Sequence, residues 1–295
     1  MKKLLVTGAS GFLGWNVIMQ ARNNYHVTGL YNTHPFSCEG VVGLPVDLCN
    51  EDEILACLAL IRPDIIIHCA AASKPAQCEA NPELSRAINV DATIVLARLC
   101  KEMGIKLVFT STDLVFDGTS GQYAEDDATG PLMLYGHQKL EAETYLLSYL
   151  SEVAVCRMPL MFGNVPANDT SSFIQHFIKE LQSGKTLDLF TDEIRSILHA
   201  EDAANGLLWA AEHANGLLHL GGKEDLSRYD FGLMMCEELG FSRAQIKPAK
   251  QSDFPGLGKR AADASLNSRF AFASGFKPQK VREGLKKLAA MARPS

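Results

Sequence analysis

Short apolar runs alternate with longer segments of mixed polarity through the first half of the chain. Continuous apolar runs of about four to eight residues are typical of strands buried on both faces of a parallel sheet. Such runs predict strands at residues 2–8, 26–31, 40–48, 64–71, 105–112 and 152–159. The segments between them predict helices at 12–24, 51–63, about 82–103, and around 135–139. The alternation indicates an α/β fold, with a doubly wound parallel sheet between two layers of helices.

The alternation becomes less regular beyond Pro159. Helical patterns near 171–183, 201–213, 228–239 and 280–291 are separated by loops that contain glycine, proline and serine. We predict a smaller α/β substrate region over residues 161–295, partly interleaved with the core and covering the carboxyl edge of the sheet. The chain is expected to return to the sheet around 216–220.

Size and charge narrow the class of protein. A chain of 295 residues, 47% hydrophobic and 21% charged, can form one large domain or two modest ones. Its net charge of −6 does not suggest the positively charged surface that nucleic acids bind, so no nucleic-acid partner is expected. The longest apolar runs are too short to cross a bilayer, so no membrane contact is expected either.

The cysteines and the first residues predict a cytoplasmic protein. None of the eight cysteines forms a C-x-x-C pair, which favours buried reduced thiols over a disulfide framework or a zinc site. The start, MKKLLVTGAS, soon reaches glycine and polar residues, so we expect a first strand and not a signal peptide. The acidic residues suggest no metal site.

The first predicted strand runs directly into TGASGFLG. The pattern G-x-x-G-x-x-G is a variant of the dinucleotide-binding turn, which brings the backbone close to a pyrophosphate at a helix N-terminus. A plain glycine-rich connection is the alternative, but the position between a strand and a helix favours cofactor binding. We predict a Rossmann-type NAD(P)-binding domain over residues 1–160, with cofactor contacts from Gly8, Ser10, Gly11, Phe12, Leu13 and Gly14.

The end of the second predicted strand bears on the choice of cofactor. An NAD site usually has an acidic residue here, but the sequence continues with Tyr31, Asn32 and Thr33 and has no acid before Glu39. This favours NADP(H) and leaves NAD(H) open, since no arginine is present to bind a 2′-phosphate. Asp47 follows the third strand and is expected either to reach the adenine or to cap the next helix.

Candidate chemistry lies at the end of the strand predicted at 105–112, where Thr112 and Asp113 reach the carboxyl edge of the sheet. Tyr135 and Lys139 follow on a helix and are spaced to share one face. The spacing alone also fits an ordinary surface pair.

Several motifs, in this order and spacing, resemble the extended short-chain dehydrogenase/reductase family. Those that resemble its dTDP-4-dehydrorhamnose reductase branch are HCAA (68–71), NVDAT (89–93), STDLVFDG (111–118), PLMLYGHQKLEAE (131–143) and CRMPLMFG (156–163). That branch also includes the non-catalytic regulatory subunit of methionine adenosyltransferase. The resemblance covers essentially the whole chain and is densest before residue 163.

The resemblance implies a role for each chemical group. Tyr135 would give a proton to the carbonyl oxygen that receives hydride, and Thr112 would hydrogen-bond that oxygen. Lys139 would lower the pKa of the phenol and bond the nicotinamide ribose. Asn89 would support Lys139 through a water, although a helix-surface asparagine is the alternative. Thr112 could otherwise be a plain β-branched strand residue.

The remaining predicted contacts flank these groups. To the cofactor site we also assign Leu48, Cys69, Ala70, Ala71 and Met158. Lys74, Asp113 and Arg195 are assigned to the substrate, with Arg195 suited to a diphosphate. The alternatives are a solvated loop lysine for Lys74, and for Arg195 a salt bridge to Glu193 or Asp192.

The sequence differs from the motifs of related enzymes at two places, and both differences bear on the predicted function. Leu114 follows Thr112 and Asp113, so the second carboxylate of the related 4,6-dehydratases is absent. The segment LFTDEIRSILHAED (189–202) replaces the D-Q-x-G-x-P-T stretch expected of rhamnose-pathway reductases, which leaves the deoxysugar open. We predict NAD(P)H-dependent reduction of a 4-keto group on a nucleotide-activated deoxysugar. The alternatives are a non-catalytic NADP-binding regulatory subunit and an NAD-dependent nucleotide-sugar epimerase; a homodimer is left open.

Overall fold

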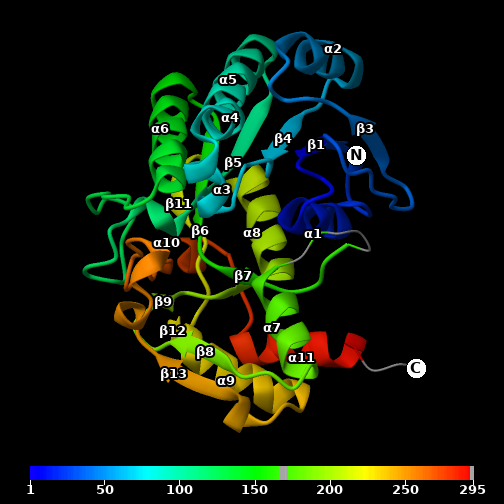
Figure 1. Cartoon of the computed structure of the whole chain (residues 1–295). Coiled ribbons are helices and arrows are strands. Elements are labelled where there is room, and N and C mark those ends of the chain that lie inside the picture. Colours follow the sequence, from blue (N-terminus) through cyan, green and yellow to red (C-terminus); the bar gives the residue numbers. More distant parts are fainter. Residues whose placement is uncertain (167–169, 171, 293–295) are drawn as a thin grey trace.

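The computed structural model describes residues 1–166, 170 and 172–292 and contains a central seven-stranded sheet (Figure 1). Its order is β11-β6-β5-β4-β1-β2-β3, and every neighbouring pair is parallel. The strands are β1 (Lys3–Thr7), β2 (His26–Tyr31), β3 (Val42–Pro45), β4 (Ile65–His68), β5 (Lys106–Thr112), β6 (Val153–Met158) and β11 (Gly216–His219). Each lies within a run that the sequence predicts as a strand. The Rossmann-type α/β fold is confirmed.

The strand order reverses between β1 and β4, where the chain crosses from one half of the sheet to the other. Their register pairs Thr7 with His68, so both strands end at the same level. Open α/β sheets bind ligands in the crevice outside the carboxyl ends at such a reversal. This geometry places the glycine turn after β1 and the loop after β4 side by side.

Helices cover both faces of the sheet because successive strand residues point to opposite sides. Leu4 and Val6 pack with α1 (Phe12–Ala21) and α8 (Ala200–His213) in one buried core. Leu5 packs on the other face, in a core shared with α2 (Glu51–Ile61), α5 (Ala92–Met103) and α6 (Leu134–Tyr149).

The helix predicted over residues 82–103 is not continuous. It begins as α4 (Pro82–Arg86), passes through a π-helical turn η1 (Ala87–Asp91), and continues as α5. A π-helical turn inserts an extra residue and re-aims its side chains, often at functional sites. Here the turn contains Asn89, which is buried. A short helix α3 (Pro75–Ala80) precedes α4.

The C-terminal part, drawn below the sheet in Figure 1, has a hydrophobic core of its own. Phe177, Phe231 and Leu285 belong to this core. Its helices and strands are α7 (Phe173–Gln182), β8 (Leu187–Phe190), α9 (Arg228–Leu239), β13 (Ile246–Ala249) and α11 (Val281–Ala292). Shorter pairs are β7 (Met161–Phe162) with β10 (Leu198–His199) and β9 (Ile194–Arg195) with β12 (Leu226–Ser227), and α10 spans Arg269–Ala273. Since β11 and α8 belong to the sheet layers, the two parts interleave. The boundary at 160/161 stays a prediction.

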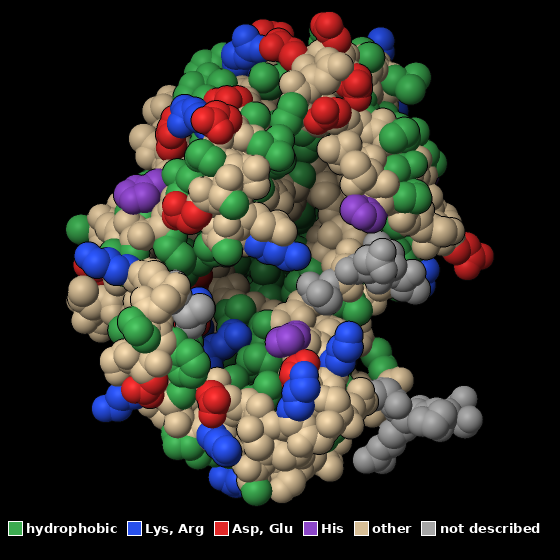
Figure 2. Space-filling view, viewed as in Figure 1, with side chains coloured by type: hydrophobic (Ala, Val, Ile, Leu, Met, Phe, Trp, Pro, Cys, Tyr) green, Lys and Arg blue, Asp and Glu red, His purple; other side chains and the backbone are tan. Residues whose placement is uncertain are grey.

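The surface is hollowed between the sheet and the C-terminal part, with hydrophobic and basic side chains around the opening (Figure 2). Among the described residues, no helix has both the length and the apolar character needed to span a membrane.

Candidate active site

The turn between β1 and α1 is built for close approach of a ligand to the backbone. Gly8 has φ +66°, and a Cβ added there would lie 2.8 Å from the backbone of Ala70 after β4. A Cβ on Gly14 would lie 2.2 Å from the carbonyl oxygen of Gly8. Larger residues would therefore push α1 away from the turn and separate β1 from β4.

The N-terminus of α1 has features of an anion site. The helix starts at Phe12 after Gly11, with no side-chain cap and no acidic residue in its first turn. Its first N–H groups, including those of Phe12 and Leu13, point along the helix axis, where an anion would bind. The Ser10 carbonyl oxygen accepts a hydrogen bond of 3.0 Å from the Thr170 hydroxyl. These residues fit a dinucleotide pyrophosphate.

The end of β2 is open to solvent on one side. The Tyr31 ring packs edge-on against Phe36, with 6.0 Å between ring centres. Asn32 and Thr33 are exposed and present a side-chain amide and a hydroxyl. Uncharged polar groups at this position would not repel a 2′-phosphate.

Asp47 does not cap the following helix. Its Oδ1 accepts a hydrogen bond of 2.9 Å from the Cys49 N–H and forms a local turn. The cap of α2 is Asn50, whose side chain accepts from two N–H groups of the first turn. Leu48, half-buried, packs against the core beneath α2. The capping alternative for Asp47 is therefore wrong.

Asn89 links the loop after β4 to α6. Its Oδ1 accepts from the Ala72 N–H at 2.8 Å, and its Nδ2 donates to Gln138 Oε1 at 2.8 Å. Gln138 is the neighbour of Lys139, so the link holds this part of α6 in position. The alternative of a surface asparagine is wrong, because Asn89 is 1% exposed.

The other predicted cofactor residues lie at strand ends on the same edge. Ala70 donates its N–H to the Thr7 hydroxyl at 3.1 Å, while Cys69 and Ala71 are half-buried beside it. Met158 ends β6 and is buried in the core against α1 and α8.

Helix α6 brings Tyr135 and Lys139 to the end of β5. A Cβ on Gly136 would lie 2.3 Å from the Leu114 carbonyl oxygen, so α6 packs directly on the turn η2 (Asp113–Val115). Lys139 is 2% exposed, and its Nζ lies 3.8 Å from the centre of the Phe109 ring. The ring face partly replaces the water that the ammonium loses.

Burial controls the protonation of both groups. Burial, and then the charge of Asp113, raise the pKa of Tyr135 well above its usual range. Burial lowers the pKa of Lys139 to about 7, opposed by Glu143. The pKa of Tyr135 thus shifts opposite to the expected lowering, because desolvation of the half-buried ring disfavours the phenolate.

Thr112 and Asp113 form a buried pair beside the tyrosine. The Thr112 hydroxyl donates to Asp113 Oδ1 at 3.1 Å and accepts from the Leu114 N–H at 3.2 Å. Asp113 Oδ2 lies 3.4 Å from Arg195 Nε. Burial raises the pKa of Asp113 to about 6, although Arg195 opposes the shift.

Arg195 is engaged by the protein. Its two terminal nitrogens donate to backbone carbonyl oxygens, at 2.6 Å to Ile194, 3.3 Å to Ala262 and 3.0 Å to Ala261. Its Nη2 lies 4.0 Å from Glu193 Oε1, so the predicted alternative partner is present but distant. Arg195 thus connects the end of β5 to the C-terminal part.

Lys74 lies at the start of α3, a helix that contacts the start of α6 through a hydrogen bond from the Leu134 N–H to Glu79. Lys74 is exposed at the position that precedes α3, just beyond the loop after β4.

Two ion pairs with buried carboxylates are not indicated by the sequence. Glu143 and Arg157 form an ion pair of 2.9 Å, and Glu193 pairs with Arg260 at 2.9 Å. Glu143 lies one turn beyond Lys139, and this repeat of four is the one signal that could have identified it. The Glu193 pair joins residues far apart in sequence, which no local pattern indicates.

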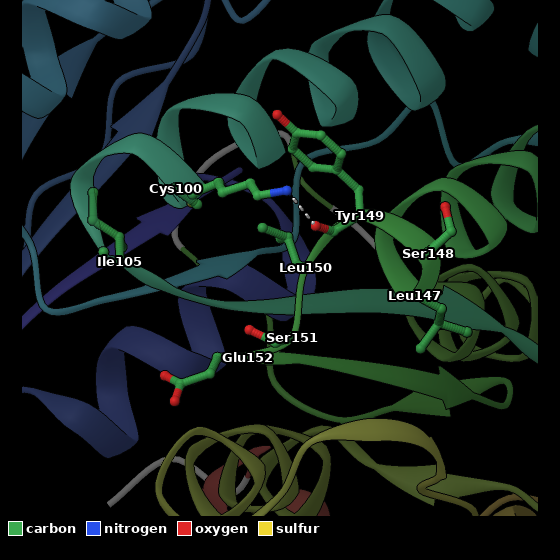
Figure 3. Close-up of a pocket in the computed structure, with 10 residues that line it drawn as sticks. Cys100, Ile105, Leu147, Ser148, Tyr149, Leu150, Ser151 and Glu152 are labelled. Carbon is green, nitrogen blue, oxygen red and sulfur yellow. Dashed lines mark hydrogen bonds between the residues drawn. The ribbon is translucent and has the colours of Figure 1, made fainter.

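A pocket of about 500 Å³ lies away from this edge (Figure 3). Its residues come from the ends of α5 and α6 and from the loops that precede β5 and β6. The Lys101 ammonium donates to the Tyr149 carbonyl oxygen at 3.2 Å, and Figure 3 shows Tyr149 at this pocket with Leu150 and Ser151. The pocket is therefore at the amino ends of the strands, opposite the ligand edge.

Among residues 1–166, 170 and 172–292, no group of three or more His, Cys, Asp or Glu side chains could hold a metal ion.

A Rossmann sheet, a helix N-terminus capped by Gly11 and a Thr–Tyr–Lys set at the same edge define a nucleotide-binding protein of the extended short-chain dehydrogenase/reductase class. The profile of the RmlD substrate binding domain family matches residues 1–293. The chain belongs to this family, in the dTDP-4-dehydrorhamnose reductase-like branch that also includes the regulatory subunit of methionine adenosyltransferase.

Similar proteins include both a methionine adenosyltransferase subunit and a protein named as a reductase. The chain is 32% identical over 257 residues to methionine adenosyltransferase 2 subunit beta of Xenopus laevis, covering 84% of this chain and 75% of that protein. It is 31% identical over 255 residues to a Haloferax volcanii protein named "Probable low-salt glycan biosynthesis reductase Agl14", covering 84% of each.

Solved structures share the fold over nearly the whole chain. dTDP-4-dehydrorhamnose reductase from Bacillus anthracis, in complex with NADP, has a TM-score of 0.87 at 21% identity and covers 99% of both chains. The reductase of the same name from Yersinia enterocolitica has a TM-score of 0.82 at 25% identity and covers 98% of this chain and 99% of its own.

Proposed function

We propose that this protein is an NAD(P)H-dependent reductase that acts on the 4-keto group of a nucleotide-activated deoxysugar. The observation that supports it most is the convergence of Thr112, Tyr135 and Lys139. All three lie at the carboxyl edge of the sheet, on the same edge as the strand reversal and the N-terminus of α1. No dehydratase pair of carboxylates accompanies them, since Leu114 follows Asp113.

The protonation states suit reduction. The bound nicotinamide supplies hydride, and the carbonyl oxygen that gains negative charge must then receive a proton. Tyr135 is fully protonated at neutral pH because its pKa is raised, so it can give that proton as a general acid. Lys139, with a pKa of about 7, is partly charged and compensates the phenolate that remains. Thr112 would donate a hydrogen bond to the same oxygen once its hydroxyl is no longer bonded to Asp113.

NADP(H) is the proposed cofactor, with NAD(H) as the weaker alternative. Asn32 and Thr33 lie exposed where an NAD-binding protein usually has a carboxylate. Substrate contacts are proposed from Lys74 and Asp113. Arg195 would act through Asp113, because its own donors bind backbone carbonyls.

A non-catalytic, NADP-binding regulatory role is the second candidate. The 32% identity to a methionine adenosyltransferase regulatory subunit favours it. An NAD-dependent epimerase is the third, since it needs the same three side chains. Cofactor that copurifies tightly, one per chain, would favour the epimerase, whereas ready exchange would favour the reductase.

The test follows the loss of NADPH and of NADH absorbance with dTDP-4-dehydrorhamnose. The matched control for Tyr135→Phe is Tyr145→Phe on the same helix, whose ring stacks on Tyr149 with 5.1 Å between centres. Oxidation by the wild type and by Tyr145→Phe that collapses in Tyr135→Phe supports the reductase. Cofactor binding without oxidation, across a panel of 4-keto sugars, would favour the regulatory role.

A further inference from the structure

The Thr112 hydroxyl has a single proton, and in this structure it forms a hydrogen bond to Asp113. A carboxylate oxygen can only accept, so the 3.1 Å contact between Thr112 Oγ1 and Asp113 Oδ1 uses the threonine proton. The same Oγ1 accepts from the Leu114 N–H at 3.2 Å. While Asp113 is ionised, Thr112 therefore has no proton left to donate to a substrate carbonyl.

Asp113 is a buried carboxyl with incomplete hydrogen bonding. It is 3% exposed, and its Oδ2 has no hydrogen-bond partner among the described residues, although Arg195 Nε lies 3.4 Å away. The charged and titratable groups facing it are Tyr135 on α6, Arg195 on β9, and Glu193 just before β9. The geometry can therefore accommodate either a carboxylate or a carboxylic acid.

We propose that Asp113 is a positioning residue that determines whether Thr112 can donate a hydrogen bond to the substrate. Ionised Asp113 accepts the hydrogen bond of the Thr112 hydroxyl, whereas protonated Asp113 leaves that hydroxyl free to donate elsewhere. This inference rests on the proposed reductase function. It assigns Asp113 a role through Thr112, beyond any contact of its own with the sugar.

The proton balance is simple. Asp113 takes one proton from solvent, and its new O–H donates to Thr112 Oγ1 in place of accepting from it. The two lone pairs of that oxygen are then used by Asp113 and by the Leu114 N–H. The threonine O–H is free to point at the carbonyl oxygen, where hydride addition builds negative charge. No covalent bond other than O–H is made or broken.

The pH range is accessible to experiment. Burial raises the pKa of Asp113 to about 6, so the protonated form dominates below that pH and the ionised form above it. A donor aimed at a developing oxyanion commonly contributes about a hundredfold to the rate. We therefore expect kcat/KM of the wild type to rise about tenfold or more as the pH falls from 8 to 5.5, through Lys139 near pH 7 and through Asp113 near pH 6.

The first test is the pH profile of kcat/KM for NADPH oxidation with the 4-keto sugar. Asp113→Asn places a permanently neutral amide beside Thr112. The amide nitrogen Nδ2 of the asparagine can donate to Thr112 Oγ1. We expect this variant to lose the inflection near pH 6. Thr112→Val is expected to lose it too, at low activity throughout. An inflection of unchanged size and position in Asp113→Asn would overturn the proposal.

The second test does not depend on turnover. Carbon-13 NMR of labelled aspartate side chains, with Asp113→Asn used to assign the signal, measures the titration of Asp113 directly. The hydrogen bond from Thr112 stabilises the carboxylate, so Thr112→Val is expected to move the Asp113 titration to higher pH. An unmoved titration would overturn the coupling. A moved titration without turnover of any 4-keto sugar would support the coupling and overturn the reductase function instead.

Discussion

The ammonium nitrogen of Lys139 lies 3.8 Å from the centre of the Phe109 ring, deep beneath the edge of the sheet where Tyr135 sits. A buried ammonium over an aromatic face is easier to deprotonate than one in water, because the ring replaces only part of its hydration. Burial, which this contact offsets only in part, explains how the lysine becomes a group that titrates near neutral pH, and it links the fold of the core to the proposed chemistry.

Lys139→Met should stabilise the fold while removing activity. The folded-state pKa of about 7 lies below the unfolded value of about 10.4, so the unfolded chain binds the extra proton between these values. Wild-type stability should therefore rise from pH 7 to 10, and the variant should lack this slope. At pH 7 we expect it to be more stable by up to about 4 kcal/mol. Urea unfolding at pH 7 and 9.5 measures this, and equal destabilisation at both values would contradict it.

Glu143→Gln should shift the titration of Lys139. Glu143 raises the lysine pKa, so its neutralisation should move the alkaline fall of kcat/KM to lower pH. The change also leaves Arg157 buried without its 2.9 Å partner, which typically costs about 3–5 kcal/mol. The double variant Glu143→Gln/Arg157→Met should regain stability but keep the shifted profile. A profile restored together with stability would show that only folding had been disturbed.

Gly136→Ala should separate the tyrosine from the end of β5. Its Cβ would lie 2.3 Å from the Leu114 carbonyl oxygen, so α6 must move away from the turn that holds Asp113. Since a displacement of about 1 Å can cost about a hundredfold in rate, kcat/KM should fall by that order. Gly256→Ala, with no atom within 4 Å of its added Cβ, is the control and should retain wild-type rates. Equal rates in both variants would refute the packing argument.

Gly14→Ala should weaken cofactor binding. An added Cβ would lie 2.2 Å from the Gly8 carbonyl oxygen and would push the N-terminus of α1 off the glycine turn. We expect the Kd for NADPH, measured by fluorescence titration, to rise about tenfold or more, since the pyrophosphate loses aligned N–H donors. Circular dichroism would verify that the variant is folded. An unchanged Kd in a folded variant would argue against this turn as the pyrophosphate site.

Local patterns predict the sheet well because buried parallel strands are continuous apolar runs. The run at 26–31 coincides with β2, and the return to the sheet at 216–220 is confirmed as β11 (Gly216–His219). The third strand is shorter than its run, Val42–Pro45 against 40–48, since it forms the edge of the sheet and pairs on one side only. The π-helical turn η1 has no compositional signal, so the sequence predicts one continuous helix there.

The site is predicted less completely because its energetics depend on tertiary packing. The spacing of Tyr135 and Lys139 is visible in sequence, but the direction of their pKa shifts follows from burial, which spacing does not report. The pairing of Asp113 with Arg195 joins segments distant in the chain. Only the fold brings Arg195 and Asp113 within 3.4 Å of each other. The hydrogen bond from Thr112 to Asp113, on which the proposed control of Thr112 rests, is likewise visible only in the structure.

Hydride transfer to the sugar tests the central claim most directly. The protein is supplied with NADPH carrying deuterium at the transferable position and with dTDP-4-dehydrorhamnose, and the product is analysed by mass spectrometry and NMR. The account predicts one deuterium at C4 of the sugar, formed at comparable rates by wild type and Tyr145→Phe and at least about a hundredfold more slowly by Tyr135→Phe. Tight NADPH binding with no deuterium in this or any other 4-keto sugar would contradict it.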